Sequence, residues 1–294
     1  MSACPTRPAL RWFGGKWLLA PKLISLFPPH RIYVEPYGGA ASVLLRKPRA
    51  YGEVYNERDE EVVSYFRVLR DPEQAAELIR RLKLTPFARA ELRDSYERSS
   101  AVDPIETARQ LVVRSFMGFG SNAAATQHKG ANSTGFRSNA NRSGTTPSMD
   151  WRNLPQALPA LTERLRGVVI EGKDAIPIMQ QHDGASTLHY VDPPYPHATR
   201  SRRNPYCKKH LYRHEMSDAD HGAMLDVLLS LKGMVVVSSY ASALYDEALA
   251  SWERTTFETF ADGARPRTEV VWSNPAAVAA RRDCAMPLFV EAAE

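Results

Sequence analysis

The chain has 294 residues, enough for one large domain or two, and its composition is that of an ordinary globular protein. It contains no apolar run of about 18 residues and no signal-like apolar stretch at its start, so we expect neither a membrane span nor secretion. Its three cysteines form no CxxC pair, which argues against a disulfide framework or a zinc site and favours a cytoplasmic location.

The formal net charge of +5 is modest, but the basic residues are unevenly distributed. Two stretches, 114–151 and 196–214, are rich in arginine and lysine. The first contains a single acid, Asp150, and the second contains none. Either stretch alone is typical of a solvated loop. Together they favour a polyanionic partner such as nucleic acid.

In chain order, the N-terminal stretch RWFGGK, residues 11–16, precedes any predicted regular structure. Its two aromatic residues, two glycines and one lysine could form an aromatic lid over a ligand. Lys16 could then pair with a carboxylate. A mobile N-terminal loop is the alternative.

Short runs rich in β-branched and aromatic residues predict the strands of the fold. Segments 60–69 and 221–231 have apolar residues at helical spacing and separate some of these runs. The alternation predicts an α/β fold with a largely parallel sheet, in which ligands bind at the carboxyl ends of the strands. The predicted strands are 31–35, 52–55, 167–171, 187–191, 234–238 and 269–272.

This alternation is interrupted between residues 71 and 166. Helices are predicted at 73–84, 87–98 and 105–117, followed by a Gly/Ser/Asn/Thr-rich stretch from 118 to 148. A polar stretch of that length is usually functional or disordered. We therefore interpret 71–166 as an inserted helical and loop domain that could order on a partner, and 1–70 with 167–294 as the main domain.

The stretch IYVEPYGGAASVLL, residues 32–45, predicts a strand, a tight turn and a helix. Gly38 and Gly39 permit the turn and the close approach of a ligand to the backbone. Glu35, at the carboxyl end of the strand, would repel a phosphate. It suits a cofactor that carries an ammonium group.

Two further acids follow predicted strands. Glu57 ends the next strand and is our choice for binding ribose hydroxyls, with Glu53 as the alternative. An acidic helix N-terminus explains Glu57 about as well, but its pairing with Glu35 on successive strands favours a cofactor site. Asp174, after VVIEGK, could accept a hydrogen bond from an adenine amino group, although a turn residue would look the same.

The stretch LHYVDPPYP, residues 188–196, ends a predicted strand with an acid, two prolines and a tyrosine. Asp192 and the Pro193 carbonyl could accept hydrogen bonds from both hydrogens of an amino group, held rigid by Pro194. Tyr195 offers a ring face for a base that has left its duplex. A Pro-Pro turn without a catalytic role is the alternative.

These motifs occur together and in order in one family. RWFGGK, YVEPYGG, VYNE, the acid of EGKD, YVDPPY and EVVWSNP resemble the Dam-type adenine-N6 DNA methyltransferases, D12 class, alpha group. The resemblance implies a Rossmann-like S-adenosylmethionine-dependent methyltransferase sheet, with 71–166 as an inserted, mainly helical target-recognition domain. It implies transfer of a methyl group to the N6 amino group of a flipped adenine in double-stranded DNA, without a metal, in a bacterial or phage setting.

The resemblance also implies roles for individual residues. Trp12 and Lys16 would contact S-adenosylmethionine from the N-terminal loop, and Asp192 from the catalytic motif. The expected catalytic residues are Asp192, Pro193, Pro194 and Tyr195. The family often has lysine at the position of Arg11 and aspartate at that of Glu57. The remaining expected cofactor contacts are Glu35, Pro36, Gly38 and Gly39 around the methionine moiety, Glu57 at the ribose and Asp174 at the adenine.

Side chains of the two basic stretches are the expected DNA contacts, through phosphates or base edges. We expect a monomer, or a dimer on DNA. The expected DNA contacts are Arg114, Asn122, Lys129, Arg137, Arg142, Arg200, Arg202, Arg203, Lys208 and Lys209, with Asn132, Asn139 and Asn141 as further candidate base readers.

Several alternatives stay open at this point. Methylation of RNA or of cytosine N4 would use a similar arrangement of acceptors, and a DNA-binding regulator could retain the fold without turnover. Restriction–modification, phage protection and a solitary epigenetic role would look alike in sequence.

Overall fold

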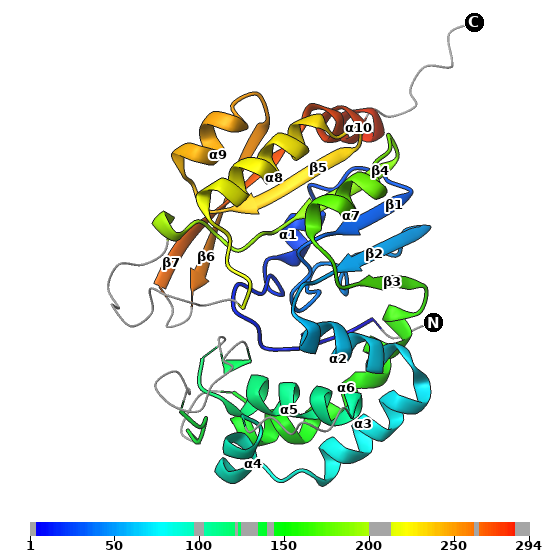
Figure 1. Cartoon of the computed structure of the whole chain (residues 1–294), viewed down its shortest axis with the longest axis vertical. Helices are drawn as coiled ribbons and strands as arrows, with labels where there is room; N and C mark the ends of the chain where they lie inside the picture. Colours follow the sequence, from blue (N-terminus) through cyan, green and yellow to red (C-terminus); the bar gives the residue numbers. More distant parts are fainter. Residues whose placement is uncertain are drawn as a thin grey trace, which may run out of the picture.

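The computed structural model describes residues 4–96, 103–120, 123–124, 135–139, 144–199, 213–261 and 265–285. Its centre is a seven-stranded sheet in which the first five strands run parallel, the sixth runs antiparallel to them, and the seventh pairs antiparallel with the sixth (Figure 1). This confirms the predicted Rossmann-like α/β class. From one edge to the other, the strands are β3 (Val168–Glu171), β2 (Gly52–Asn56), β1 (Ile32–Glu35), β4 (Thr187–Val191), β5 (Met234–Ser239), β7 (Arg265–Ser273) and β6 (Glu253–Ala261).

One face of the sheet is covered by α7 (Ala175–Gln181), α8 (Asp218–Ser230) and α9 (Ala243–Ala248) (Figure 1). On this face, Val191 and Val237 pack against α8 and α9. Because side chains alternate along a strand, Tyr33 and Tyr190 point to the opposite face and enter the larger core there. That face also packs against α1 (Ala20–Ile24) and α10 (Pro275–Ala285).

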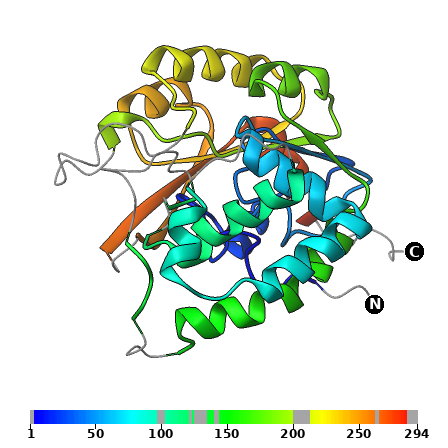
Figure 2. The ribbon, with the colours of Figure 1, turned by 60° about the horizontal axis from the view of Figure 1, so that its bottom comes forward.

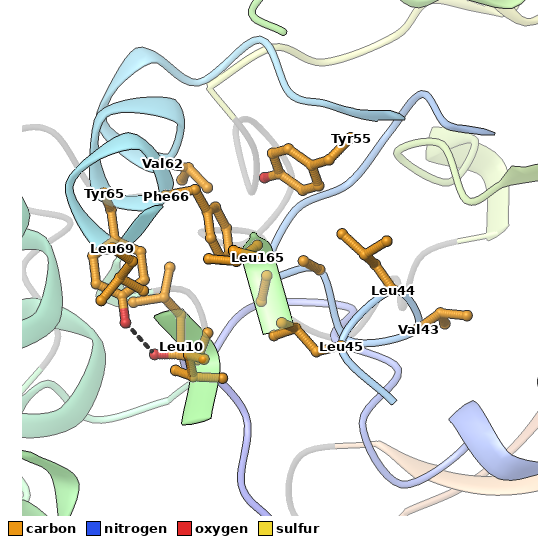
Figure 3. Close-up of a cluster of buried hydrophobic side chains, with 14 of the residues drawn as sticks. Leu10, Val43, Leu44, Leu45, Tyr55, Val62, Tyr65, Phe66, Leu69 and Leu165 are labelled. Carbon is orange, nitrogen blue, oxygen red and sulfur yellow. Dashed lines mark hydrogen bonds between the residues drawn. The ribbon is translucent and has the colours of Figure 1, made fainter. Parts of the chain in front are cut away.

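Helices α2 to α6 form a layer next to the sheet (Figures 1 and 2). Their apolar faces join the same core as the sheet and the N-terminal loop, and Figure 3 shows Phe66 and Leu165 close to Tyr55 and Leu45. Because the helices and the sheet share one core, the predicted division into an inserted domain, 71–166, and a main domain stays a prediction. The helices are α2 (Glu60–Arg70), α3 (Pro72–Leu84), α4 (Arg89–Asp94), α5 (Pro104–Met117) and α6 (Pro147–Leu165).

Helix α6 was not predicted, because Pro155 and Pro159 lie inside it and proline disrupts helix interiors. The helix persists because Trp151, Leu154, Leu158, Leu161 and Leu165 recur every three or four residues and are all buried. Packing of this stripe against the core outweighs the lost backbone hydrogen bonds.

Two other expectations need correction. The helix predicted at 87–98 is shorter, with α4 spanning only Arg89–Asp94. Strand β6 was not predicted, because it is an edge strand with exposed Arg254 and Glu258 among its residues, so it lacks a continuous apolar run.

A buried ion cluster fastens α6 to the sheet. The Glu53 carboxylate accepts hydrogen bonds from Lys47 at 2.9 Å and from Arg164 at 2.6 Å, and all three side chains are almost fully buried. The two cations lower the pKa of Glu53 despite its burial. The Glu53 carboxylate is thus engaged by two cations of the core, and Glu53 does not line the cavity described below. Among the described residues, no helix is long and apolar enough to cross a membrane.

The buried His189 of β4 should make the fold sensitive to acid. Its Nε2 lies 3.6 Å from the Asp183 carboxylate, beyond hydrogen-bond distance, and burial lowers the pKa of His189 to about 4 against the raising effect of Asp183. The unfolded chain therefore binds a proton first, and stability falls as the pH drops from about 6.5 towards 4. We expect this residue to account for up to about 3 kcal/mol of that loss.

Urea unfolding of the wild type and of His189→Leu, at several pH values between 7.5 and 4.5, checks the expectation. The free energy of unfolding of the variant should depend less steeply on pH over this interval. Equal slopes for the two proteins would show that His189 is not responsible.

Candidate active site

A cavity of about 480 Å³ opens at the carboxyl ends of β1, β2 and β4. The structure brings together all nine residues predicted to bind the cofactor, and every one of them lines this cavity. Pro193 and Pro194 also line it, so the predicted catalytic stretch borders the same space. These nine residues are Trp12, Lys16, Glu35, Pro36, Gly38, Gly39, Glu57, Asp174 and Asp192.

The wall after β1 is a tight turn that requires glycine. The Gly38 N–H donates to the Asn56 carbonyl at 2.8 Å, which places a Cβ at this position only 2.1 Å from the Tyr55 ring. Gly39 has a φ of +48°, in the left-handed region that glycine adopts readily. The Tyr55 hydroxyl donates to the Gly39 carbonyl at 2.7 Å and fixes the turn.

The helix predicted after this turn is absent, because residues 40–47 form a series of turns. The absence of a helix here is explained by the Glu35 side chain. The Leu44 N–H donates to the Glu35 carboxylate at 3.0 Å, whereas in a regular helix it would donate to the backbone carbonyl four residues earlier. The acid therefore organises the turn as well as facing the cavity.

The Glu35 carboxylate is buried at the end of β1. It accepts a second hydrogen bond, from the Tyr33 hydroxyl at 2.7 Å. Burial raises the pKa of Glu35 to about 8, against the lowering effect of these two hydrogen bonds. The group is therefore mostly protonated near neutral pH, and a cation in the cavity would favour its ionised form.

Glu57 lies on the opposite side of the turn. Its carboxylate accepts from the Gly39 N–H at 2.8 Å and from the Asp59 N–H at 3.0 Å, which leaves acceptor capacity for a ligand hydroxyl. Burial raises the pKa of Glu57. Asp174, just before α7, is exposed and forms an ion pair with Arg58 at 3.2 Å.

Asp192, directly after β4, contacts three side chains. Its Oδ1 accepts from the Ser238 hydroxyl at 3.0 Å and lies 3.2 Å from the Tyr195 hydroxyl. Its Oδ2 lies 2.9 Å from the Lys16 ammonium. The carboxylate is thus fixed between the N-terminal loop, β5 and the Pro-Pro turn.

Tyr195 is buried and does not line the cavity. Its hydroxyl donates to Glu269, and Tyr240 packs against its ring edge-on at a centroid distance of 4.7 Å. The Lys16 ammonium lies 4.8 Å from the centre of the Tyr195 ring. In this state Lys16 therefore occupies space that a base stacked on that ring would need.

Two residues at the site, Glu269 and Asp59, had no predicted role, and a third, Arg213, was expected only to contact DNA. Glu269 belongs to the stretch EVVWSNP, whose family match is a signal that could have identified it. Arg213 and Asp59 line the cavity and form an ion pair at 2.8 Å, with both side chains buried. Arg213 also pairs with Glu61 of α2, but its place in a basic stretch suggested only a DNA contact.

The predicted DNA contacts fall into three groups. The expected DNA contact of Arg114 needs correction, because the Arg114 side chain is buried, donates to the Ser95 carbonyl and pairs with Glu61. Arg137 is partly buried and donates to the Phe116 carbonyl at 2.9 Å, while Asn139 is exposed. The remaining predicted contacts lie outside the described residues: Asn122, Lys129, Asn132, Asn141, Arg142, Arg200, Arg202, Arg203, Lys208 and Lys209.

Among the described residues, no group of three or more histidine, cysteine, aspartate and glutamate side chains is arranged to hold a metal ion.

The sequence was compared with protein families and with curated proteins. Residues 12–259 match the family described as D12 class N6 adenine-specific DNA methyltransferase. The comparison with curated proteins gives no match. The family match spans the N-terminal loop, the glycine turn, the Asp-Pro-Pro-Tyr stretch and the helices between them. The chain therefore belongs to the D12 class of N6 adenine-specific DNA methyltransferases, enzymes that transfer a methyl group from S-adenosylmethionine to adenine in DNA.

Proposed function

We propose that the cavity is the S-adenosylmethionine site of this methyltransferase and that Asp192 is its catalytic acceptor. The observation that carries the proposal is the position of Asp192. It lies at the edge of a cavity lined by every expected cofactor ligand and also contacts Tyr195 of the same motif. One carboxylate therefore borders both the cofactor space and the expected target-base space.

The residues present fit this cofactor. Gly38 and Gly39 leave room for a ligand against the backbone, and Glu35 faces the cavity as the partner of a cationic group. Glu57 would hold the ribose hydroxyls and Asp174 the adenine amino group, while Trp12 and Lys16 would close the site. When bound, the cofactor supplies an electrophilic methyl group on a sulfonium.

The chain's own residues prepare the amino group of the target. Its nitrogen is a weak nucleophile because its lone pair is delocalised into the adenine ring. Asp192 and the Pro193 carbonyl would accept the two amino hydrogens and so favour a localised lone pair. Because the Pro-Pro turn and the Ser238 hydrogen bond hold these acceptors rigid, little reorganisation is needed as charge develops.

Double-stranded DNA is the proposed substrate, with the target adenine turned out of the duplex towards Tyr195. Arg137 and Asn139 remain candidate contacts. Arg114, buried in its pair with Glu61, instead supports the helical layer.

Replacing the catalytic acceptor tests the proposed site. Asp192→Ala should lower single-turnover methyl transfer to adenine roughly 100- to 1,000-fold, because one preorganised electrostatic contact to the reacting group is lost. Transfer from labelled S-adenosylmethionine to unmethylated mixed-sequence DNA, followed by nucleoside analysis, measures this. Asp226→Ala, the same change on the exposed side of α8, is the matched control. A wild-type rate in Asp192→Ala would refute the assignment.

Glu35 provides a test of the cofactor site. Its pKa of about 8 means that the ligand-free protein carries most of a proton there at pH 7.5. A sulfonium and an ammonium nearby should lower this pKa, so binding should release roughly half to one proton and tighten as the pH rises towards 8.5.

Calorimetry of S-adenosylmethionine binding in buffers with different ionisation enthalpies measures the released proton. S-adenosylhomocysteine, which lacks the sulfonium charge, should release less, and Glu35→Gln should release none through this group. Binding heats that do not depend on the buffer in the wild type would contradict the expected role of Glu35.

A further inference from the structure

A second carboxylate, Glu269 of β7, lies behind Asp192 and does not line the cavity. Its Oε1 lies 3.5 Å from the Lys16 ammonium and accepts the hydrogen bond of the Tyr195 hydroxyl. That hydroxyl also lies 3.2 Å from Asp192. Glu269 thus touches both groups that contact Asp192 from this side, without reaching the space in which the cofactor or the base would lie.

Within the part of the chain that the structure describes, two carboxylates share one ammonium group at this point. Asp192 and Glu269 are the two carboxylates, and the Lys16 ammonium contacts both. The side chains of Glu269 and Lys16 are 5% and 9% exposed, so an unpaired charge on either would be costly. The titratable and charged groups around Glu269 are Lys16 of the N-terminal loop, Tyr190, Asp192 and Tyr195 at the end of β4, Tyr240 after β5, and Arg267 of β7, whose guanidinium lies 5.7 Å from the centre of the Tyr240 ring.

Catalysis creates a conflict at Lys16. In this state the ammonium holds Oδ2 of Asp192 and lies beside the Tyr195 ring, while Oδ1 is taken by Ser238. A target base that stacks on Tyr195 needs the space that Lys16 occupies beside the ring, and the ammonium competes with the amino group of the base for Oδ2 of Asp192. Lys16 has to move away from Asp192 without leaving a buried, unpaired ammonium.

We propose that Glu269 is a positioning residue that receives Lys16 from Asp192 when the target adenine enters, and so frees Asp192 to bind the amino group. The inference rests on the proposed role of Asp192. The shift is short, because Lys16 already lies 3.5 Å from Glu269 and 2.9 Å from Asp192. The pairing of β7 with β5 and the Tyr195 hydroxyl hold Glu269 in place to receive it.

Glu269→Gln tests the inference, because it keeps an oxygen for the Tyr195 hydroxyl and removes only the charge. Without that charge, Lys16 stays on Asp192. The maximum single-turnover rate of methyl transfer should fall roughly 10- to 100-fold, whereas the dissociation constants of S-adenosylmethionine and DNA should change less than about two-fold. Glu258→Gln, the same change at an exposed position of β6 opposite Thr268, should leave all three values unchanged.

A double-mutant cycle shows whether Glu269 acts through Lys16. If it does, the variant with both Lys16→Met and Glu269→Gln should transfer the methyl group no more slowly than Lys16→Met alone. Losses that multiply would overturn the inference. A rate of Glu269→Gln equal to the wild type, with Asp192→Ala inactive, would overturn it as well and leave the proposed function intact.

The pH dependence separates this role from a purely structural one. Burial raises the pKa of Glu269, against the lowering effect of Lys16. At saturating cofactor, the wild-type rate should therefore fall as Glu269 becomes protonated on the acid side, and this limb should disappear in Glu269→Gln. Glu269→Asp keeps the charge, so its rate should be lower but should show the same fall on the acid side of the pH profile. This variant keeps the test valid even if Glu269→Gln does not fold. An unchanged limb in Glu269→Gln would contradict the transfer of Lys16.

Discussion

The ion pair between Lys16 and Asp192 connects parts of the chain that are far apart in sequence. Lys16 belongs to an N-terminal loop without regular structure, and Asp192 follows a central strand. Their contact draws the loop over the ends of β1 and β4 and closes one wall of the cavity. The same lysine reaches Glu269 on β7, so three segments converge on a single ammonium group. The cavity has its present shape because this loop is fastened at Lys16.

A second set of charges fastens the helical layer to the same site. Glu61 of α2 pairs with Arg114 of α5 and with Arg213, which lies just beyond a segment with predicted DNA contacts. Arg213 also pairs with Asp59 at the cavity wall. These contacts are buried, so each partner depends on the others for compensation of its charge. The helices and the cavity are therefore held together by ion pairs as well as by the apolar core.

The sequence predicted those parts of the fold whose signal is local. The strands from 31–35 to 234–238 are short runs rich in β-branched and aromatic residues, and the structure places them within one or two residues of the prediction. Helix α6 was not predicted, because only its tertiary packing offsets the two prolines inside it. Strand β6 was not predicted, because as an edge strand it carries exposed polar residues and has no continuous apolar run. The short turns after Gly39 depend on a contact between Glu35 and Leu44, which no local pattern reveals.

The candidate site divides in the same way. The acids that end strands could be found from sequence, because the carboxyl ends of parallel strands meet at one edge of a sheet. The family match of EVVWSNP could mark Glu269, but its role could not be predicted, because that role depends on where an antiparallel strand enters the sheet and on the side chains that Glu269 meets there. Arg114 was misplaced for the opposite reason, since a basic residue near a polar loop carries no sign of the buried Glu61 that it meets.

The contact between Gly38 and Tyr55 limits how this site can evolve. A side chain at position 38 needs the space of the Tyr55 ring, so it demands a smaller residue at position 55. That smaller residue would also remove the hydroxyl that holds the Gly39 carbonyl. If position 38 changes first, the new side chain clashes with the Tyr55 ring. If position 55 changes first, the turn loses the hydrogen bond to the Gly39 carbonyl. A change at either position is therefore tolerated only together with a change at the other.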